Sequence, residues 1–146
     1  MIRKLQELIN LARKSPPTRV AVAAAAHELV LESVQRAVDL GLIEPILVGR
    51  EDDIRERAEA LGWRLRDDQI VGTPTNTAAA TAAVDLVREG RAQVLMKGYL
   101  HTDEMLKAVL RQDVGLRTDR LLSHVFILEV PTYHKLLLIT DAAINI

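Results

Sequence analysis

Apolar and polar positions along the chain predict strands and helices in regular alternation. The continuous apolar run at residues 19–25, which follows two prolines, is typical of a strand buried on both faces. Shorter apolar runs predict strands at 45–48, 69–72 and 93–96. Between the runs, apolar residues recur at the spacing of one helical face. The predicted helices cover residues 2–14, 27–40, 51–61, 75–89 and 103–111.

The helix ends and helix faces support this division. Gly41, Gly62 and Gly90 stand where a glycine commonly ends a helix. The polar connection at 63–68 leaves room for one short strand. The inward-facing residues are predicted to be Val30, Val34, Ala37 and Val38 in the helix at 27–40, and Met105, Leu106, Val109 and Leu110 in the helix at 103–111.

The pattern changes after residue 111. A polar loop at 112–120 is followed by predicted strands at 124–130 and 135–140, which are joined by a short turn. Strands joined so closely must pair antiparallel. The whole order predicts an α/β fold, with a mainly parallel three-layer sheet to which the hairpin adds an antiparallel edge. We expect residues 1–146 to form one domain.

Composition and charge exclude several classes of function. The net charge of −1 argues against binding to nucleic acid or to an anionic membrane. The chain has no cysteine, which excludes disulfides, thiolate metal sites and a cysteine nucleophile. Its N-terminus carries charges where a signal peptide would be apolar, and no apolar run is long enough to span a membrane. The expected location is the cytoplasm.

The common nucleotide and metal motifs are also missing. The sequence has neither a glycine-rich dinucleotide turn after its first strand nor a phosphate-binding P-loop. Its four histidines are dispersed, with no pair at metal-ligand spacing on a helix. We therefore expect no bound metal and no dinucleotide cofactor.

The strongest candidate for chemistry is the turn at 96–102, between a predicted strand and a predicted helix. Ligands of α/β proteins bind where strand carboxyl ends meet helix amino ends. This turn carries Lys97, His101 and Thr102, and the helix after it offers backbone N–H groups to an anion. The alternative is that Lys97 is merely solvated and Thr102 only caps the helix.

Two further polar clusters follow. Arg117 and Thr118 lie beside Gly115, which permits an unusual backbone path, in a loop with Arg120, Ser123 and His124. Asp141 and Asn145 follow Thr140 at the end of the last strand. A guanidinium can hold phosphate with two hydrogen bonds, but solvated loops and ordinary turns have the same composition. Among the other histidines, His27 is interpreted as a residue of the first helical turn and His134 as part of the hairpin turn.

Taken together, these motifs resemble the phosphate acetyltransferase/phosphate butyryltransferase family, and the butyryl-type branch most closely. The early strand Val20-Ala21-Val22-Ala23-Ala24-Ala25 and Glu44-Pro45-Ile46-Leu47-Val48-Gly49 also resemble the family, so the similarity spans nearly the whole chain. It rests on Val94-Leu95-Met96-Lys97-Gly98 with His101-Thr102, on Gly115-Leu116-Arg117-Thr118 with Arg120-Leu121-Leu122-Ser123-His124-Val125, and on Thr140-Asp141-Ala142-Ala143-Ile144-Asn145-Ile146.

The resemblance implies a reaction in which acyl-CoA and phosphate exchange with acyl phosphate and CoA. It implies a fold similar to isocitrate and isopropylmalate dehydrogenases, no bound cofactor, CoA as a substrate, and usually a homodimer. Asp119 stands where the family commonly has glycine. Family members are roughly twice as long, which is consistent with two domains, so this chain corresponds to their N-terminal half. The half that is lacking would carry the second wall of the cleft, most CoA contacts and the base that deprotonates the thiol.

From this portion we expect phosphate or acyl phosphate to be bound by a set of polar residues, and we assign no catalytic base. A non-catalytic α/β module that binds anions without turnover is the competing hypothesis, and a dehydrogenase on the same fold is a weaker one. The expected substrate-binding residues are Lys97, His101, Thr102, Arg117, Thr118, Ser123, Asp141 and Asn145.

Overall fold

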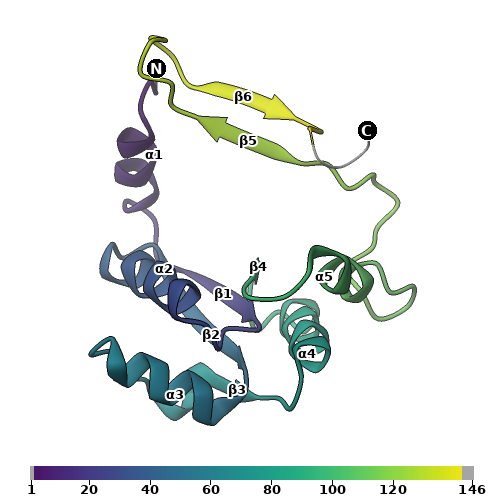
Figure 1. Ribbon diagram of the computed structural model, residues 1–146. Coiled ribbons are helices and arrows are strands. Elements are labelled where there is room, and N and C mark those ends of the chain that lie inside the picture. Colours follow the sequence, from purple (N-terminus) through teal and green to yellow (C-terminus); the bar gives the residue numbers. More distant parts are fainter. Residues whose placement is uncertain (1, 143–146) are drawn as a thin grey trace. The chain divides into compact units, whose positions relative to one another are not determined.

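The computed structural model describes residues 2–142. Within it the chain forms two compact units, one built from residues 17–117 and the other from the segments on either side. The larger unit contains a four-stranded sheet in which all neighbouring strands are parallel (Figure 1). Its strands are β1 (Thr18–Ala23), β2 (Ile43–Gly49), β3 (Ile70–Gly72) and β4 (Val94–Lys97).

Helices cover both faces of this sheet, as predicted. They are α2 (Glu28–Asp39), α3 (Glu51–Ala60), α4 (Asn76–Arg88) and α5 (Thr102–Val109). Side chains alternate along β1, so that Val20 and Val22 pack with α2 and α3 while Ala21 and Ala23 pack with α4 and α5. The predicted three-layer architecture is therefore confirmed for this unit.

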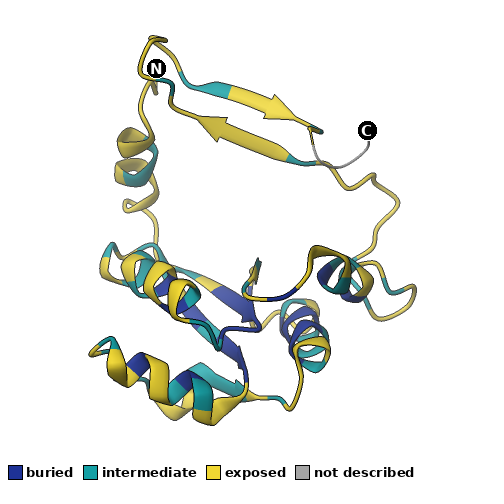
Figure 2. Cartoon of the chain, viewed as in Figure 1, coloured by how far each residue is buried: buried dark blue, intermediate teal, exposed yellow. Residues whose placement is uncertain are grey.

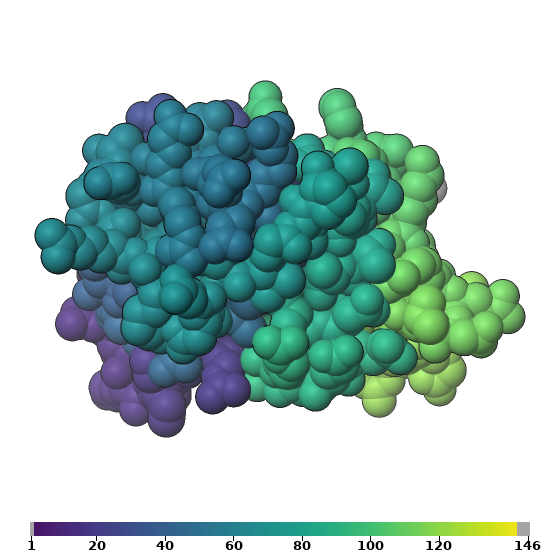
Figure 3. Space-filling view, turned by 90° about the horizontal axis from the view of Figure 1, so that it is seen from below, coloured from purple at the N-terminus to yellow at the C-terminus, as the bar shows by residue number. Residues whose placement is uncertain are grey.

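The core is aliphatic and follows the central strands. Figure 2 shows buried residues concentrated along β1, β2 and α4. The small alanines of α4, among them Ala79 and Ala83, are fully buried and let this helix lie close to the sheet. In the space-filling view, the blue and teal segments that include α3 and α4 pack into one continuous surface (Figure 3).

Helix ends agree with the prediction better than helix faces do. Gly41, Gly62 and Gly90 follow α2, α3 and α4 with positive φ angles. In α2, however, Leu31 is fully buried together with Val34, although Leu31 was not among the predicted inward residues. In α5 the buried residues are Met105 and Ala108, while Leu110 is exposed. The spacing of apolar residues predicts that a helix forms, but the residues that face the core can be the neighbours of the predicted ones.

The connection before β3 also differs from the expectation. No strand forms at 63–68; a 3-10 helix, η1 (Asp67–Gln69), leads into β3 instead. Arg66 and Asp68 form an ion pair there, with Arg66 Nε 2.9 Å from Asp68 Oδ1. Trp63 and Leu65 still pack against the core, but the local polar bonds of Arg66, Asp68 and Gln69 form a 3-10 turn in place of a strand.

The smaller unit contains α1 (Leu5–Ala12) and a hairpin of β5 (Val125–Leu128) and β6 (Leu137–Thr140). The backbone N–H of Leu5 donates to Glu129 Oε2 at 2.8 Å. None of these three elements contains a buried residue (Figure 2). The prediction of an antiparallel hairpin is confirmed, but in the described chain it forms a separate two-stranded sheet and not an edge of the parallel one. A short turn fixes the pairing of two strands, yet the sequence pattern does not say which other sheet they join.

The order of the strands defines where a ligand site is expected. The sheet runs β3-β2-β1-β4, so the chain moves outward from β1 to β3 and then returns to the other side of β1 with β4. The connections after β1 and β4 lead to opposite faces of the sheet, because α2 packs on one face and α5 on the other. The carboxyl ends of β1 and β4 are thus the switch point of this sheet.

Candidate functional site

The turn after β4 packs directly on the turn after β1. The N–H groups of Gly98 and Tyr99 donate to the carbonyl oxygens of Ala23 and Ala24, at 2.8 and 2.9 Å. A Cβ atom at Gly98 would lie 2.4 Å from one of these oxygens and 2.5 Å from the other. Ala24 itself has a φ of +53°, which a residue with a side chain rarely adopts. The backbone at the switch point is therefore closely packed and accepts only glycine at position 98.

A pocket of about 340 Å³ opens at this turn. Its walls come from the β4–α5 turn and from the first turns of α4 and α5. They are formed by Asn76, Lys97, Gly98, Tyr99, Leu100, His101 and Glu104. The structure therefore brings two of the predicted residues, Lys97 and His101, to one pocket at the expected edge of the sheet.

The ammonium group of Lys97 folds back over this turn. Its Nζ donates to the carbonyl oxygen of Leu100 at 2.8 Å and approaches that of Gly98 at 3.5 Å. Both partners are neutral, so the positive charge of Lys97 is not compensated by a carboxylate in these contacts. Its charge is therefore available to attract an anionic ligand into the pocket.

The first turn of α5 is less open to an anion than the sequence indicates. His101 stands at the N-cap and Thr102 is the first helical residue, with its side chain exposed. Glu104 Oε2 accepts the N–H of His101 at 3.2 Å. The pKa of Asp103 is lowered, chiefly because Lys107 Nζ donates to its carboxylate at 3.2 Å and also because backbone N–H groups of this turn donate to it. These carboxylates occupy N–H donors that the sequence analysis offers to an anion. The basic groups of the pocket are therefore the main features that would attract an anion.

Residues of α4 complete the pocket, and the sequence did not identify them as site residues. Asn76 Nδ2 donates to the carbonyl oxygen of Tyr99 at 3.1 Å, and Thr77 Oγ1 lies 3.3 Å from Glu104 Oε1. Thr75 Oγ1 accepts the N–H of Ala78 at 3.1 Å and so caps the helix. These bonds tie the first turn of α4 to the β4–α5 turn. A polar cluster at a predicted helix start was the only signal for them.

His27 and Tyr99 form a second feature of the switch point that local patterns missed. Their rings stack with centroids 3.9 Å apart and planes inclined by 15°. His27 occupies the N-cap position of α2 without a side-chain capping bond, directly before the first helical turn in which the sequence places it. Because it follows β1 and Tyr99 follows β4, the stack bridges the two turns that leave the sheet for opposite faces.

The predicted Arg117 loop begins in the larger unit. Gly115 packs against the end of α5, where an added Cβ would lie 2.4 Å from the carbonyl oxygen of Val109. Its role is this close approach, since its φ is not among the positive ones. Arg111 fixes the segment further, because its guanidinium bonds to Asp85 Oδ1 at 3.1 Å and to the carbonyl oxygen of Val114 at 3.3 Å. Arg117 follows this anchored turn with an exposed side chain.

The other predicted residues lie in the smaller unit. Thr118 Oγ1 accepts the N–H of Arg120 at 3.2 Å, and Ser123 is exposed. Asp141 meets His124 at the open end of the hairpin: its N–H donates to the His124 carbonyl oxygen at 2.8 Å, and its Oδ1 accepts the His124 N–H at 3.3 Å. Asp141 has a φ of +55°. Asn145 lies outside the described residues.

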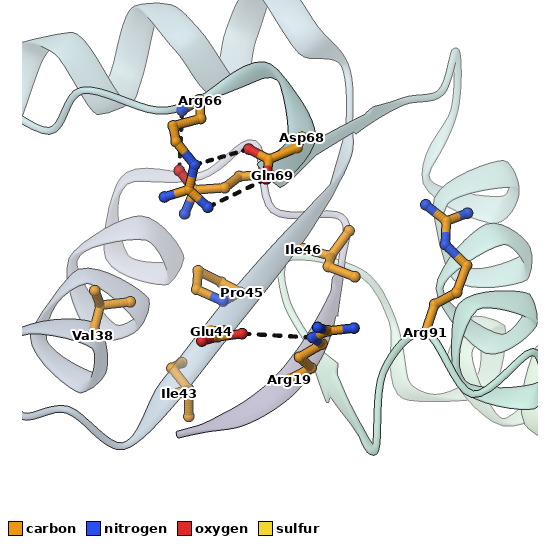
Figure 4. A pocket seen from close by; sticks show the side chains of 10 residues that line it. All are labelled: Arg19, Val38, Ile43, Glu44, Pro45, Ile46, Arg66, Asp68, Gln69 and Arg91. Carbon is orange, nitrogen blue, oxygen red and sulfur yellow. Dashed lines mark hydrogen bonds and ion pairs between the residues drawn. The ribbon is translucent and has the colours of Figure 1, made fainter. Parts of the chain in front are cut away.

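A second hollow, of about 420 Å³, lies at the opposite, amino-terminal edge of the sheet (Figure 4). Three arginines line it, but two are paired with acids in the same hollow: Arg19 with Glu44 at 3.5 Å and Arg66 with Asp68 at 2.9 Å. In this hollow two guanidinium groups are already held by carboxylates, whereas the bonds of Lys97 Nζ in its own pocket, which Glu104 also lines, go to carbonyl oxygens. Within residues 2–142, no group of three or more histidine or acidic side chains is arranged to hold a metal ion. The helices of this part of the chain are all too short or too polar to cross a bilayer.

Comparison with known proteins agrees with the motifs. A family profile described as "Phosphate acetyl/butaryl transferase" matches residues 67–146. The phosphate acetyltransferase of Rhizobium meliloti is 46% identical over 143 residues, which cover 98% of this chain and 45% of that protein. The phosphate butyryltransferase of Clostridium acetobutylicum is 40% identical over 145 residues, which cover 99% of this chain and 48% of that protein. The chain spans about half the length of the curated relatives it matches.

Comparison of the structure with solved structures agrees with the sequence comparisons. The crystal structure of a branched-chain phosphotransacylase from Enterococcus faecalis V583 superimposes with a TM-score of 0.69 at 30% identity. The match covers 88% of this chain and 44% of that one. Since the profile covers more than half of the residues and includes the β4–α5 turn with Lys97, the chain belongs to the phosphate acetyl/butaryl transferase family.

Proposed function

We propose that the chain is the part of a phosphate acyltransferase that binds the phosphoryl end of the substrate. The reaction is the exchange of acyl-CoA and phosphate with acyl phosphate and CoA. The observation that carries the proposal is the pocket at Lys97, which lies at the switch point of the sheet and within the segment that matches the family profile. Family membership supports the class of reaction, and the pocket supports Lys97 as the phosphoryl-binding residue.

The reaction requires a cation and hydrogen-bond donors but no change of oxidation state. In our proposal the CoA thiolate attacks the carbonyl carbon of the acyl phosphate, so that a C–S bond forms and the C–O bond to phosphate breaks. The departing phosphate needs positive charge, and the developing oxyanion needs N–H or O–H donors. We propose Lys97 and Arg117 for the phosphate charge. The proposed polar contacts are His101, Thr102, Thr118, Ser123, Asp141 and Asn145.

We assign no residue of this chain as the base that takes the thiol proton. We further propose that the protein acts in the cytoplasm as a homo-oligomer and needs no bound metal or redox cofactor, with CoA as a substrate. The reaction itself supports the proposal that no redox cofactor is needed, because an acyl group moves between sulfur and oxygen without oxidation or reduction.

The alternative is an α/β module that binds anions without turnover. It requires only the anion-binding groups of the pocket at Lys97 and no group that acts on the CoA thiol. A direct assay separates the two functions. The chain is mixed with acetyl or butyryl phosphate and CoA, and the loss of free thiol is followed. Thiol loss supports the acyltransferase, whereas binding of acyl phosphate without thiol loss supports the module.

Binding is measured by thermal unfolding in the presence of phosphate. A ligand that binds only the folded state at one hundred times its Kd stabilises that state by about 2.7 kcal/mol. We expect phosphate to raise the Tm of the parent and of Lys135→Ala, which removes an exposed lysine from the hairpin turn. Lys97→Ala should lose most of this increase. Equal increases in all three proteins would show that Lys97 does not bind the phosphate.

A chimaera tests the function in the context of a whole enzyme. The segment of the Rhizobium meliloti phosphate acetyltransferase that aligns with this chain is replaced by it, and CoA-dependent consumption of acetyl phosphate is measured. We expect activity, and we expect Lys97→Ala in the chimaera to reduce it at least tenfold, the loss that corresponds to about 1.4 kcal/mol. A folded chimaera that is inactive, or one that is indifferent to Lys97→Ala, would contradict the proposed role.

A further inference from the structure

Tyr99 is the one aromatic residue that lines the pocket at Lys97. Its position is set by its backbone, because its N–H donates to the carbonyl oxygen of Ala24 and its own carbonyl oxygen accepts the side-chain amide of Asn76. Its ring is set by the stack on His27. The ring is therefore held in place before any ligand arrives, which lowers the entropy lost on binding.

Despite this support, the side of Tyr99 that is not stacked remains accessible. The residue is 63% exposed, although the chain has only four aromatic residues and a core built from aliphatic ones. An aromatic ring contributes to binding mainly by losing contact with water. A fixed and accessible ring beside a pocket thus offers apolar area that a ligand can cover.

The pocket consequently has two chemically different sides. Its polar side holds the basic groups of Lys97 and His101 together with Asn76 and the carboxylate of Glu104. Its other side consists of the ring of Tyr99, the backbone of Gly98 and the aliphatic side chain of Leu100. An acyl phosphate has the same division, with a dianionic head and a short alkyl chain. The volume of about 340 Å³ lies at the lower end of the range of small-molecule sites.

We propose that Tyr99 is a specificity-determining residue whose ring forms the wall against which the acyl chain of the substrate lies. This inference rests on the proposed function, because it requires the phosphoryl group to be held at Lys97. His27 acts through Tyr99 as a positioning residue. The length of the acyl chain that the protein prefers then depends on how much alkyl surface the ring covers.

The test uses inorganic phosphate and the series methyl-, ethyl-, propyl- and butylphosphonate as stable probes, with Kd measured calorimetrically on the full chain. Full burial of one CH₂ group tightens binding by about fourfold. We expect the Kd of the parent and of Tyr99→Phe to fall by roughly twofold to fourfold for each added carbon. In Tyr99→Ala the series should become nearly flat, because no ring remains for the added carbons to cover.

The control is Tyr133→Ala, which removes the only other tyrosine, an exposed residue of the hairpin turn. It should keep the dependence on chain length. A parent without such dependence, or a Tyr99→Ala variant that retains it, overturns the role of Tyr99 while leaving phosphate binding and the proposed function intact. Failure of the parent to bind phosphate and every phosphonate overturns the proposed phosphoryl site and, with it, this inference. Circular dichroism confirms that each variant is folded.

Discussion

At the scale of single residues, the backbone contacts at Gly98 constrain the turn that carries Lys97. A methyl group at this position would overlap two carbonyl oxygens of the β1 turn, and neither atom belongs to a flexible side chain. We expect Gly98→Ala to destabilise the fold by about 1–3 kcal/mol, the usual cost of forcing extra volume into a packed region. Urea unfolding measures this loss.

Gly72→Ala is the matched control for Gly98→Ala. An added Cβ at Gly72 would lie 3.5 Å from the nearest atom, Glu51 Oε2, which is an ordinary contact with a side chain. Its cost should be within about 0.5 kcal/mol, as for most exposed substitutions. Similar losses for both variants would show that the close approach at Gly98 is relieved by movement of the turn.

The sequence predicts Lys97 and His101 as site residues because both follow a strand in one short turn, which is a local pattern. His27 and Asn76 contribute to the same turn from distant parts of the chain, and no local pattern contains that information. The use of the Asp103 and Glu104 carboxylates by the first turn of α5 was also missed, although acidic residues at a helix start are a common sign of it.

At the scale of elements, Arg111 joins α5 to α4. Its guanidinium is largely covered, with 30% of the side chain exposed, and it bonds to Asp85 as well as to the carbonyl oxygens of Ala108 and Val114. We expect Arg111→Ala to cost about 1–3 kcal/mol, because Asp85 and two carbonyl oxygens lose a charged donor. Chemical denaturation gives the value.

Lys107→Ala provides the comparison on the same helix. Lys107 forms an ion pair with Asp103 at 3.2 Å, but 79% of its side chain is exposed. Such surface pairs contribute little, so we expect a change of less than about 1 kcal/mol. If Lys107→Ala were as destabilising as Arg111→Ala, burial of the guanidinium would not explain the effect.

The Asp103–Lys107 pair also predicts a dependence on pH. Because the pair lowers the folded-state pKa of Asp103 below its ordinary value of 3.8, it contributes stability above that value and loses the contribution as the pH falls through the folded pKa. NMR titration of the Asp103 carboxyl carbon should give a higher pKa in Lys107→Ala than in the parent. An unchanged pKa would show that the backbone donors alone lower it.

Element prediction succeeded where the physics is local and failed where it is not. The sequence predicts β1 because its residues form a continuous apolar run, and it predicts the hairpin because the turn between the two strands is short. That the hairpin forms its own sheet was not predicted, because pairing between sheets depends on contacts that the period of a pattern does not contain.

At the scale of the whole molecule, the hairpin is unusual because both of its faces are apolar and exposed. The register pairs Phe126 with Ile139 and Leu128 with Leu137 on one face, and Ile127 with Leu138 on the other. Antiparallel ribbons that face water normally carry polar residues on one side, and an isolated pair of strands is only marginally stable. If the chain forms the homo-oligomer proposed above, the apolar ribbon of a second copy is the surface that we expect to cover this one.

The inference predicts self-association that depends on the hairpin, and two leucines test it. Leu138 in β6 and Leu29 in α2 are both 66% exposed, but Leu29 belongs to the larger unit and not to the hairpin. Burying one leucine is worth about 1.5–3 kcal/mol, so Leu138→Lys should weaken a symmetric dimer by at least tenfold, whereas Leu29→Lys should not. Sedimentation equilibrium over a range of concentrations measures both. A parent that stays monomeric at high concentration, or two variants that associate equally, would show that the ribbon is not the contact between copies. Its apolar faces would then have to be buried by something other than a second copy.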